Sequence, residues 1–318
     1  MVEASDLHGL MAMMPAFATD DAVTLRAKHT VDVERLRTGL DRMIGDGADV
    51  IATTGSFGEC HALLLDEFET LTRESIDVTK GRVPLFIGVT SPNARETVQK
   101  TEIAQRAGAQ AVLVGIPYYF PSTLENAVRF LVDLAEMFPR LGIMVYHNPA
   151  LHNVRLPVEA FPELTKHRNI VAMKDSHRDP TEFMRLQKII SGKISVFCFQ
   201  GQYFQYSDLG APGFWSIDAW MGPWPQLALR DAVSRGDREA AAAITLDIMG
   251  PNTVTVNPSW RETARKIAIR MAGYVDPGPL RPPFLEIPTD VTERQKKAVE
   301  RWKGLCEKYR PKTAAARS

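Results

Sequence analysis

The sequence has few cysteines and no long apolar run. Of its 318 residues only three are cysteine, and none of them stands in a C-x-x-C spacing. An odd number cannot pair completely, and scattered cysteines lack the spacing of zinc and redox motifs. No apolar segment approaches the roughly 20 residues of a membrane-spanning helix, and the N-terminus has no basic region followed by an apolar run. The sequence therefore predicts a soluble, unexported protein in a reducing cytoplasm. The three cysteines are Cys60, Cys198 and Cys306.

An excess of charge of either sign is also absent. Lys plus Arg and Asp plus Glu number 38 each, so the formal net charge is zero. Such a chain has no general positive field to attract nucleic acid or an anionic membrane. The hydrophobic and charged fractions, 45% and 24%, are ordinary for a globular protein that can bury a sizeable core. We therefore expect neither nucleic acid nor a membrane as a partner.

Short apolar runs rich in valine and isoleucine alternate with longer amphipathic stretches. Two of these stretches are VERLRTGLDRMIGDG (33–47) and ARETVQKTEIAQRAGA (94–109). Apolar strands without polar alternation, separated by helices, are typical of a parallel sheet that is covered on its outer face. Eight such units in roughly 220 residues favour a closed (β/α)8 TIM barrel over an open doubly wound sheet. The candidate strands are residues 10–14, 49–54, 84–89, 111–116, 142–146, 170–174, 195–199 and 213–217.

The pattern changes after the eighth candidate strand. From residue 222 onward the sequence indicates helices interrupted by GPNTVTVNPSW (250–260) and DPGPLRPPFLEIP (276–288). We predict a barrel over residues 1–221 and a C-terminal helical extension, packed on the barrel, over residues 222–318. The final residues, KYRPKTAAARS (308–318), are expected to fray.

Candidate functional residues stand where the predicted strands end, because a barrel of this kind places its chemistry there. The second strand is followed by TTGSFGEC (53–60), and the fourth by PYYFP (117–121). The fifth ends in YHNP (146–149), and the sixth, within NIVAMKDS (169–176), ends at a lysine. Tyr146 and Lys174 are about one βα repeat apart, so a phenol and an amine are expected on neighbouring strands at similar height.

A lysine at the tip of a buried strand needs a physical reason. Burial opposes the charge of an ammonium unless the group is paired or deprotonated. A desolvated lysine has a lowered pKa and can attack a ketone to form a Schiff base, while an adjacent tyrosine can relay protons. We interpret Lys174 and Tyr146 in this way. The alternatives are a lysine that reaches solvent or pairs with Asp175, and a tyrosine that only packs at the rim.

Taken together, these motifs resemble a known family. The segment Gly-Ser-Phe-Gly-Glu (55–59), Tyr146, Lys174 and GPLRPPF (278–284) look like the dihydrodipicolinate synthase and N-acetylneuraminate lyase superfamily of pyruvate-handling class I aldolases. The resemblance covers nearly the whole chain. It implies a lysine imine with the substrate, no metal or organic cofactor, and a homo-oligomer, either dimer or tetramer.

Within that superfamily the sequence looks most like the hydratase-aldolases of polycyclic aromatic degradation, which cleave a benzylidenepyruvate into an aromatic aldehyde and pyruvate. Phe57 stands where the biosynthetic synthases usually have threonine, and Trp215 where a small aliphatic residue is more usual. Both residues are expected to add flat apolar area for an aromatic oxo acid. The alternatives are a dihydrodipicolinate synthase or sialate lyase type enzyme, and a non-catalytic barrel that binds an oxo acid.

The resemblance also implies roles for individual residues. Lys174 would condense with the C2 ketone of the pyruvoyl portion, and Tyr146 would move the hydroxyl proton during carbon–carbon cleavage. Ser56, with the N–H groups of Ser56 and Phe57 after Gly55, would hold the carboxylate.

Other residues have weaker assignments. Asn148, Tyr119 and Trp215 are expected in the substrate pocket, although Trp215 as a filler of the barrel mouth is an alternative. Tyr118 and Tyr119 equally suit a contact with a neighbouring subunit. Glu59 is expected to be structural, as a cap of the next helix. Three histidines lack a metal-ligand pattern and are interpreted as structural, namely His147, His152 and His177.

Arg261 underlies a prediction about the ortho substituent of the substrate. It follows Trp260 and opens the predicted helix ETARKIAIRMAG, so it is expected to point to the barrel mouth. A guanidinium suits an ortho carboxylate, because its planar fork makes two charge-assisted hydrogen bonds. This favours trans-2'-carboxybenzylidenepyruvate, of phenanthrene degradation, over trans-o-hydroxybenzylidenepyruvate, of naphthalene degradation. The alternative is an arginine that faces solvent or pairs with Glu262.

Overall fold

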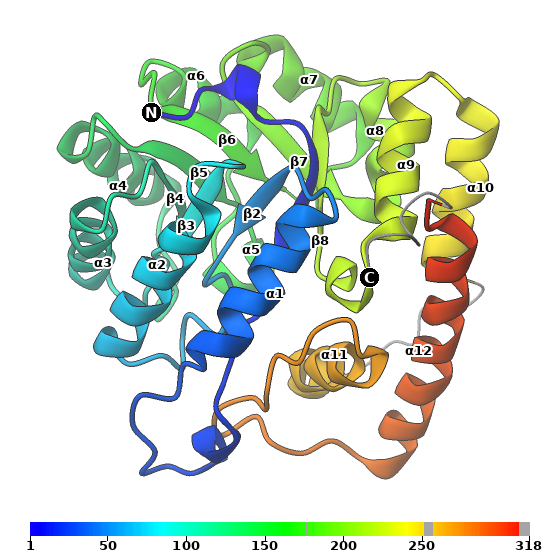
Figure 1. The fold of residues 1–318 in the computed structure, drawn as a ribbon. Coiled ribbons are helices and arrows are strands. Elements are labelled where there is room, and N and C mark those ends of the chain that lie inside the picture. Colours follow the sequence, from blue (N-terminus) through cyan, green and yellow to red (C-terminus); the bar gives the residue numbers. More distant parts are fainter. Residues whose placement is uncertain (176, 251–256, 312–318) are drawn as a thin grey trace.

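A computed structural model describes residues 1–175, 177–250 and 257–311 of the chain. Parallel strands β1 to β8 form a closed barrel in sequential order, with helices around it (Figure 1). The predicted TIM barrel is therefore confirmed. The strands are β1 (Gly9–Met13), β2 (Val50–Ala52), β3 (Leu85–Gly88), β4 (Ala111–Val114), β5 (Gly142–Tyr146), β6 (Ile170–Lys174), β7 (Ser195–Phe199) and β8 (Gly213–Ser216).

Three strands, β5, β6 and β7, have the bounds that the sequence predicted, and the other five are shorter or shifted at their ends. The run 49–54 is an instructive case, because only Val50–Ala52 form a strand. Thr54 has a φ of 39°, in the left-handed region, and its hydroxyl donates a hydrogen bond to the Gly88 carbonyl at 2.7 Å. The chain thus turns out of the sheet before the predicted strand ends, and the turn leads into the loop with Ser56.

Helices follow the strands, and polar side chains fix where several of them begin. At these positions a side-chain oxygen just before the helix accepts a hydrogen bond from a backbone N–H of the first turn. Such residues include Asp32, Asn93, Thr123, Asp179 and Asp237. The helices are α1 (Val33–Gly45), α2 (Leu65–Thr79), α3 (Ala94–Arg106), α4 (Leu124–Met137), α5 (Pro149–His152), α6 (Phe161–Leu164), α7 (Pro180–Ile190), α8 (Tyr203–Ser207), α9 (Trp224–Ser234), α10 (Arg238–Met249), α11 (Pro258–Ala272) and α12 (Thr289–Tyr309). Short 3-10 turns are η1 (Ala4–Asp6), η2 (Asp20–Val23), η3 (Val158–Ala160), η4 (Gln200–Gln202) and η5 (Asp218–Met221).

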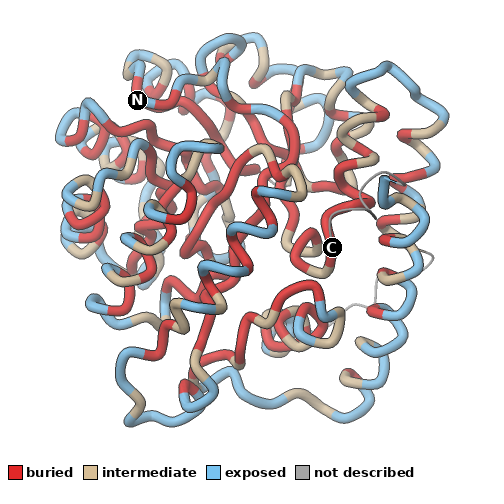
Figure 2. Tube along the Cα trace, in the orientation of Figure 1, coloured by how far each residue is buried: buried red, intermediate tan, exposed pale blue. Residues whose placement is uncertain are grey.

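The apolar core has two parts. Nearly all strand residues are buried (Figure 2). One cluster fills the barrel interior and includes Met11, Phe86 and Phe197 together with Tyr146 and Trp215. The larger cluster lies between the strands and the surrounding helices. Each fully buried large apolar side chain stabilises the fold by about 1.5–3 kcal/mol relative to an exposed one. Tyr146 of β5 and Trp215 of β8, both candidate site residues, are therefore packed within the interior cluster.

The C-terminal helices do not all lie apart from the barrel. Helix α9 follows β8 and packs against β1, so it covers the barrel although it begins after residue 221. Helix α11 packs against η5 and α12, and it lies at one end of the barrel in Figure 1. The predicted boundary at 221/222 thus lies between β8 and a helix that packs against the barrel. Most of the GPNTVTVNPSW segment, residues 251–256, and most of the predicted frayed tail, residues 312–318, lie outside the described residues.

Glu59 anchors α11 to the barrel and does not cap α2. Its carboxylate is buried and accepts hydrogen bonds from Lys266 of α11 and from the N–H of Arg281, the latter at 3.0 Å. Helix α2 begins after Leu64, whose N–H donates instead to the Glu67 side chain. The expectation of a helix cap is therefore wrong, whereas a structural role is supported. The reason is tertiary, because Glu59 pairs with cations more than 200 residues away in sequence, 207 for Lys266 and 222 for Arg281.

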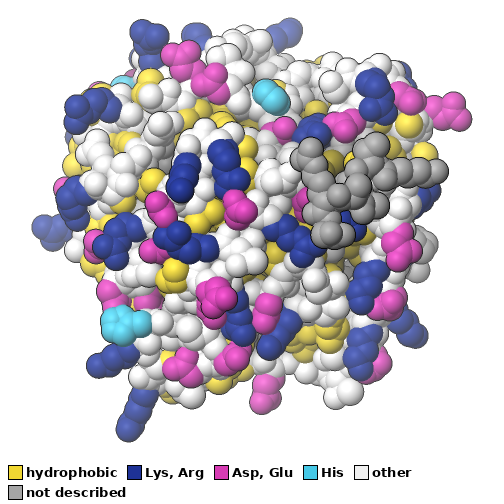
Figure 3. All heavy atoms as spheres, viewed as in Figure 1, with side chains coloured by type: hydrophobic (Ala, Val, Ile, Leu, Met, Phe, Trp, Pro, Cys, Tyr) yellow, Lys and Arg dark blue, Asp and Glu magenta, His cyan; other side chains and the backbone are white. Residues whose placement is uncertain are grey.

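The described surface shows charges of both signs. On the face in Figure 3, basic and acidic side chains are interspersed, and no single sign dominates. Among the described residues, no helix combines the length and the apolar character that crossing a membrane requires.

Candidate active site

The centre of the candidate site is Lys174, the last residue of β6. Tyr146 lies beside it in the β5–β6 register. The ammonium nitrogen Nζ of Lys174 lies 3.6 Å from the ring centroid of Trp215 and 4.5 Å from that of Tyr146. Burial lowers the pKa of Lys174 to about 7, although attraction to Asp175 opposes the shift. The amine is therefore partly neutral near pH 7, as a nucleophile requires.

The pH dependence of imine formation follows from this pKa. Because only the neutral amine attacks a ketone, the rate of adduct formation with pyruvate is expected to rise with pH and level off above the pKa of about 7. The rate is measured by mass spectrometry of samples reduced with cyanoborohydride at a series of pH values. A lysine with ordinary solvation would instead show a rate still rising near pH 10. That result would contradict the desolvated lysine.

Tyr146 is held by two polar side chains. Its hydroxyl lies 3.1 Å from the Ser56 hydroxyl, and the Asn148 amide donates to it at 3.3 Å. Burial raises the pKa of Tyr146, and these two hydrogen bonds partly oppose the shift. The His152 ring packs edge-on against the Tyr146 ring, with centroids 4.9 Å apart. Tyr146 is thus a protonated, oriented phenol with a hydroxyl neighbour to which a proton can pass.

The loop after β2 presents backbone donors near the phenol. A Cβ on Gly55 would lie 3.1 Å from the Met13 methyl group and 3.8 Å from the Tyr146 ring, so a larger residue would crowd the site. In the described part of the chain, the N–H groups of Ser56 and Phe57 have no hydrogen-bond acceptor. Two adjacent free N–H groups can receive a carboxylate. Their use by the pyruvoyl carboxylate stays a prediction.

Phe57 and Trp215 have different surroundings. The Phe57 side chain is only 4% exposed and packs in the cluster between strands and helices, away from the interior cluster. Its ring therefore does not add the aromatic surface at the rim that the sequence suggested, because the chain turns this side chain toward the helices. Trp215 packs in the interior cluster, its indole N–H donates to the Asp175 carbonyl at 3.0 Å, and its ring contacts Phe199. Phe199 is an aromatic neighbour that the sequence did not single out.

Asp175 organises a buried polar cluster behind the lysine. His147 and His177 each place Nδ1 against one carboxylate oxygen, at 3.1 and 2.9 Å, and Arg178 lies 2.8 Å from the other. Burial would raise the pKa of Asp175, but the hydrogen bonds from both histidines and the Arg178 charge outweigh it and keep the pKa well below its usual range.

Three side chains of this cluster have a spacing that could hold a metal ion, namely His147, Asp175 and His177. Their ligand atoms lie within 4.8 Å of one another. The Leu156 N–H, however, donates to His147 Nε2 at 3.0 Å, so the ring proton is on Nδ1 and points at Asp175. A protonated Nδ1 cannot bind a metal, and Arg178 already contacts the carboxylate. We therefore interpret His147, Asp175 and His177 as a hydrogen-bonded cluster that fixes the ends of β5 and β6.

Two predicted pocket residues lie at the surface. Tyr119 is 73% exposed and packs edge-on against Phe120, with ring centroids 4.9 Å apart. No described contact joins it to Lys174 or Tyr146. Its part in substrate binding stays a prediction, as does the alternative of a subunit contact for Tyr118 and Tyr119.

Arg261 lies in the first turn of α11, which begins at Pro258 and so earlier than predicted. Its side chain is 45% exposed, and Nε lies 3.5 Å from Glu262 Oε1. This arrangement matches the alternative interpretation, in which Arg261 faces solvent or pairs with Glu262. Arg265, one turn further along, also contacts Glu262, at 3.3 Å. After burial, the positive charge of Arg265 is a further cause that lowers the pKa of Lys174. Sequence reasoning missed Glu262 and Arg265 as site residues, because no strand-end pattern marks them.

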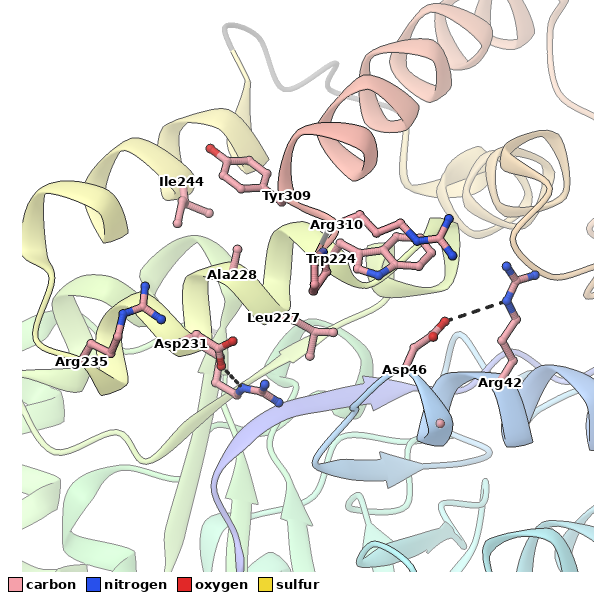
Figure 4. A pocket seen from close by; sticks show the side chains of 13 residues that line it. Arg42, Asp46, Trp224, Leu227, Ala228, Asp231, Arg235, Ile244, Tyr309 and Arg310 are labelled. Carbon is pink, nitrogen blue, oxygen red and sulfur yellow. Dashed lines mark hydrogen bonds and ion pairs between the residues drawn. The ribbon is translucent and has the colours of Figure 1, made fainter. Parts of the chain in front are cut away.

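A separate cavity of about 970 Å³ lies between α1, α9, α10 and the end of α12 (Figure 4). It is lined by Trp224 and several arginines and contains none of the predicted site residues. Two of its arginines are paired with carboxylates, Arg42 with Asp46 at 3.9 Å and Arg230 with Asp231 at 2.8 Å. The cavity has no arrangement of groups that suggests chemistry, so the candidate site remains the barrel mouth.

A TIM barrel with a buried, desolvated lysine beside a tyrosine at the strand ends defines a carbon–carbon lyase of the class I aldolase type. Comparison with protein families agrees, since residues 15–302 match the dihydrodipicolinate synthetase family. The chain belongs to this family.

Named relatives with similarity along nearly their whole length include several hydratase-aldolases. A trans-O-hydroxybenzylidenepyruvate hydratase-aldolase of Pseudomonas aeruginosa is 29% identical, over 96% of this chain and 95% of that protein. A trans-2'-carboxybenzalpyruvate hydratase-aldolase of Nocardioides sp. strain KP7 is 25% identical, over 97% and 96%. The solved structure described as PhdJ bound to substrate intermediate has a TM-score of 0.90 and 26% identity, covering 97% of this chain and 99% of that one.

Proposed function

We propose that the protein is a Schiff-base hydratase-aldolase that cleaves an ortho-substituted benzylidenepyruvate into an aromatic aldehyde and pyruvate. The observation that carries the proposal is Lys174 Nζ, buried 3.6 Å from the ring centroid of Trp215 and beside Tyr146. This arrangement supports an amine nucleophile next to a flat apolar surface. The similarity to hydratase-aldolases named for hydroxy and carboxy substrates supports the same conclusion.

The reaction begins with condensation of Lys174 and the C2 ketone, which releases water and gives an iminium. The N–H groups of Ser56 and Phe57 hold the adjacent carboxylate. Water adds across the conjugated C3=C4 bond, because the iminium withdraws electrons from it. Tyr146 then takes the proton of the C4 hydroxyl as the C3–C4 bond breaks, while its own phenol proton passes to the Ser56 hydroxyl at 3.1 Å, which releases its proton to solvent. The aldehyde leaves, C3 of the enamine is protonated, and hydrolysis releases pyruvate.

Turnover tests this proposal directly. The purified protein is incubated with trans-2'-carboxybenzylidenepyruvate and with trans-o-hydroxybenzylidenepyruvate, and the aldehyde and pyruvate are quantified. Formation of both products in equal amounts is expected. A protein that binds these acids without cleaving them would be an oxo-acid-binding barrel, and one that instead condenses pyruvate with an amino-acid semialdehyde would be a synthase of the dihydrodipicolinate kind.

We propose the carboxy compound as the better substrate, with 2-carboxybenzaldehyde and pyruvate as products. Arg261 and Arg265 on α11 both flank the Glu262 carboxylate, so two guanidinium groups stand close together at this helix. A guanidinium can bind an ortho carboxylate with two charge-assisted hydrogen bonds. Arg261→Asn is expected to reduce kcat/KM for the carboxy compound by on the order of 2–3 kcal/mol, and to affect the hydroxy compound far less.

Arg265→Asn is the matched variant for this experiment, because both arginines contact Glu262 Oε1. Steady-state kinetics give kcat/KM of each variant, relative to the wild type, for the carboxy and for the hydroxy compound. A carboxy-selective loss in Arg265→Asn but not in Arg261→Asn would move the contact to Arg265. Equal losses on the two substrates would remove the preference for the carboxy compound.

A further inference from the structure

We propose that Glu262 is the general base that activates water for the hydration step of the proposed reaction. The inference rests on the proposed function, because hydration is a step of that reaction. Tyr146 handles the C4 hydroxyl during cleavage, so addition of water to the C3=C4 bond still lacks a group to receive the water proton. A carboxylate near the barrel mouth with one unused oxygen is suited to this task.

Helix α11 is fixed on the rim where the strands end. Lys266 is buried, and its ammonium donates to the carbonyl of Ala16, in the loop after β1, at 2.8 Å and to Glu59, in the loop after β2. Glu262 lies four residues earlier, and residues at this spacing share one face of a helix, about 6 Å apart along its axis. The face of α11 that docks on the barrel rim therefore carries Glu262.

The two oxygens of Glu262 have different surroundings. Oε1 lies 3.5 Å from Arg261 Nε and 3.3 Å from Arg265 Nη1. Oε2 is buried and has no hydrogen-bond partner among the described residues. A buried carboxylate oxygen without a donor is costly, because it has lost its water without replacement. A water molecule bound by Oε2 would satisfy it, while the contacts of the two arginines with Oε1 orient the carboxylate.

The charge of Glu262 acts on both candidate catalytic residues. For Lys174, burial is the first cause and lowers the pKa, Asp175 opposes this shift, and Arg265 and Glu262 follow with a lowering and a raising effect. For Tyr146, burial is again the first cause, and Glu262 contributes a further upward shift. A charge whose influence reaches both the amine and the phenol supports a position of the carboxylate at the barrel mouth.

The proposed step is balanced in atoms and electrons. Glu262 Oε2 takes a proton from water as the water oxygen forms a bond to C4 of the iminium-linked substrate. The C3=C4 electrons move to C2–C3, and the C=N electrons move to nitrogen, which gives an enamine. The proton is then delivered to C3, so the net change is addition of one water across the double bond. Retro-aldol cleavage by Lys174 and Tyr146 follows.

Glu262→Gln separates this step from cleavage. With unsubstituted trans-benzylidenepyruvate, loss of its conjugated absorbance is expected to slow by about 10² to 10⁴, the range for loss of a general base. Cleavage of the already hydrated 4-hydroxy-2-oxo acid is expected to remain within about threefold of the wild type. In the reverse direction, the variant should accumulate the aldol of benzaldehyde and pyruvate and make little of the conjugated acid.

The controls distinguish the possible failures. Glu293→Gln removes the same charge at an exposed position on α12, where Glu293 pairs with Lys296, and is expected to leave both rates unchanged. Retained adduct formation with pyruvate shows that Glu262→Gln is folded. Equal loss of hydration and cleavage, or no loss of either, would overturn the role of Glu262. A wild-type protein inactive on both compounds would instead reject the proposed function.

Discussion

Lys174→Met is expected to abolish both the reducible adduct with pyruvate and all turnover. The wild-type protein, treated with pyruvate and borohydride, should gain the mass of the reduced adduct on the peptide that contains Lys174. Methionine fills a similar volume without an amine, so the barrel interior remains packed. An intact adduct in the variant, or labelling at another lysine, would remove the mechanism.

The same variant is expected to be more stable than the wild type. The folded pKa of Lys174 is about 7, against 10.5 for an ordinary lysine, and about 1.4 kcal/mol corresponds to each pKa unit. Because the folded pKa is the lower one, burial of the ammonium opposes folding by on the order of 3–5 kcal/mol below pH 7, and the penalty disappears as pH rises from about 7 to 10.5.

Chemical denaturation at pH 6.5 and at pH 10 measures this difference. The stability gain of Lys174→Met should be large at pH 6.5 and small at pH 10. A variant less stable than the wild type at pH 6.5 would show that Lys174 is a satisfied structural cation. An enzyme that holds such a lysine retains it at a cost in stability, which is common at active sites.

Tyr146→Phe is expected to reduce turnover by about 10² to 10⁴ and to leave adduct formation with pyruvate intact. The change removes only the hydroxyl, which lies 3.1 Å from Ser56 and accepts a hydrogen bond from Asn148 at 3.3 Å. The ring keeps its packing against His152. Relay through the hydroxyl therefore predicts a loss in kcat with little change in the affinity for pyruvate.

Steady-state kinetics and the borohydride assay on the same variant measure both quantities. Asn148→Ala is the companion variant, because it removes one hydrogen bond to the phenol and leaves the phenol in place. A much smaller effect is expected for it. Near wild-type turnover in Tyr146→Phe would reduce the role of Tyr146 to packing.

Some of the site followed from the sequence because it depends on regular geometry. In a parallel barrel, consecutive strands pair in register, and the residues at their C-terminal ends meet at one rim. Tyr146 and Lys174 were therefore predicted to be neighbours from their spacing alone, and β5 and β6 have the predicted bounds. Val- and Ile-rich strands alternate along the sequence with helices that end at glycine. Because this alternation is visible in the sequence, the fold could also be predicted from it.

Other features depended on contacts between distant segments, for which no periodic pattern exists. Glu59 looked like a helix cap, but its partners Lys266 and Arg281 come from the C-terminal region. Phe57 looked like a rim aromatic, but the turn after β2 directs its ring toward the helices. Local patterns cannot report which way such side chains point.

The sequence by itself determined the barrel, the position of the lysine at a strand end and the tyrosine beside it, because these follow from strand periodicity and register. The tertiary structure decided how far burial lowers the Lys174 pKa, since that depends on the surrounding Trp215 and Tyr146 rings. It also decided that α11 brings Glu262 and Arg265 to the rim. Their position depends on a buried ion pair between Lys266 and Glu59, which lie 207 residues apart in the chain.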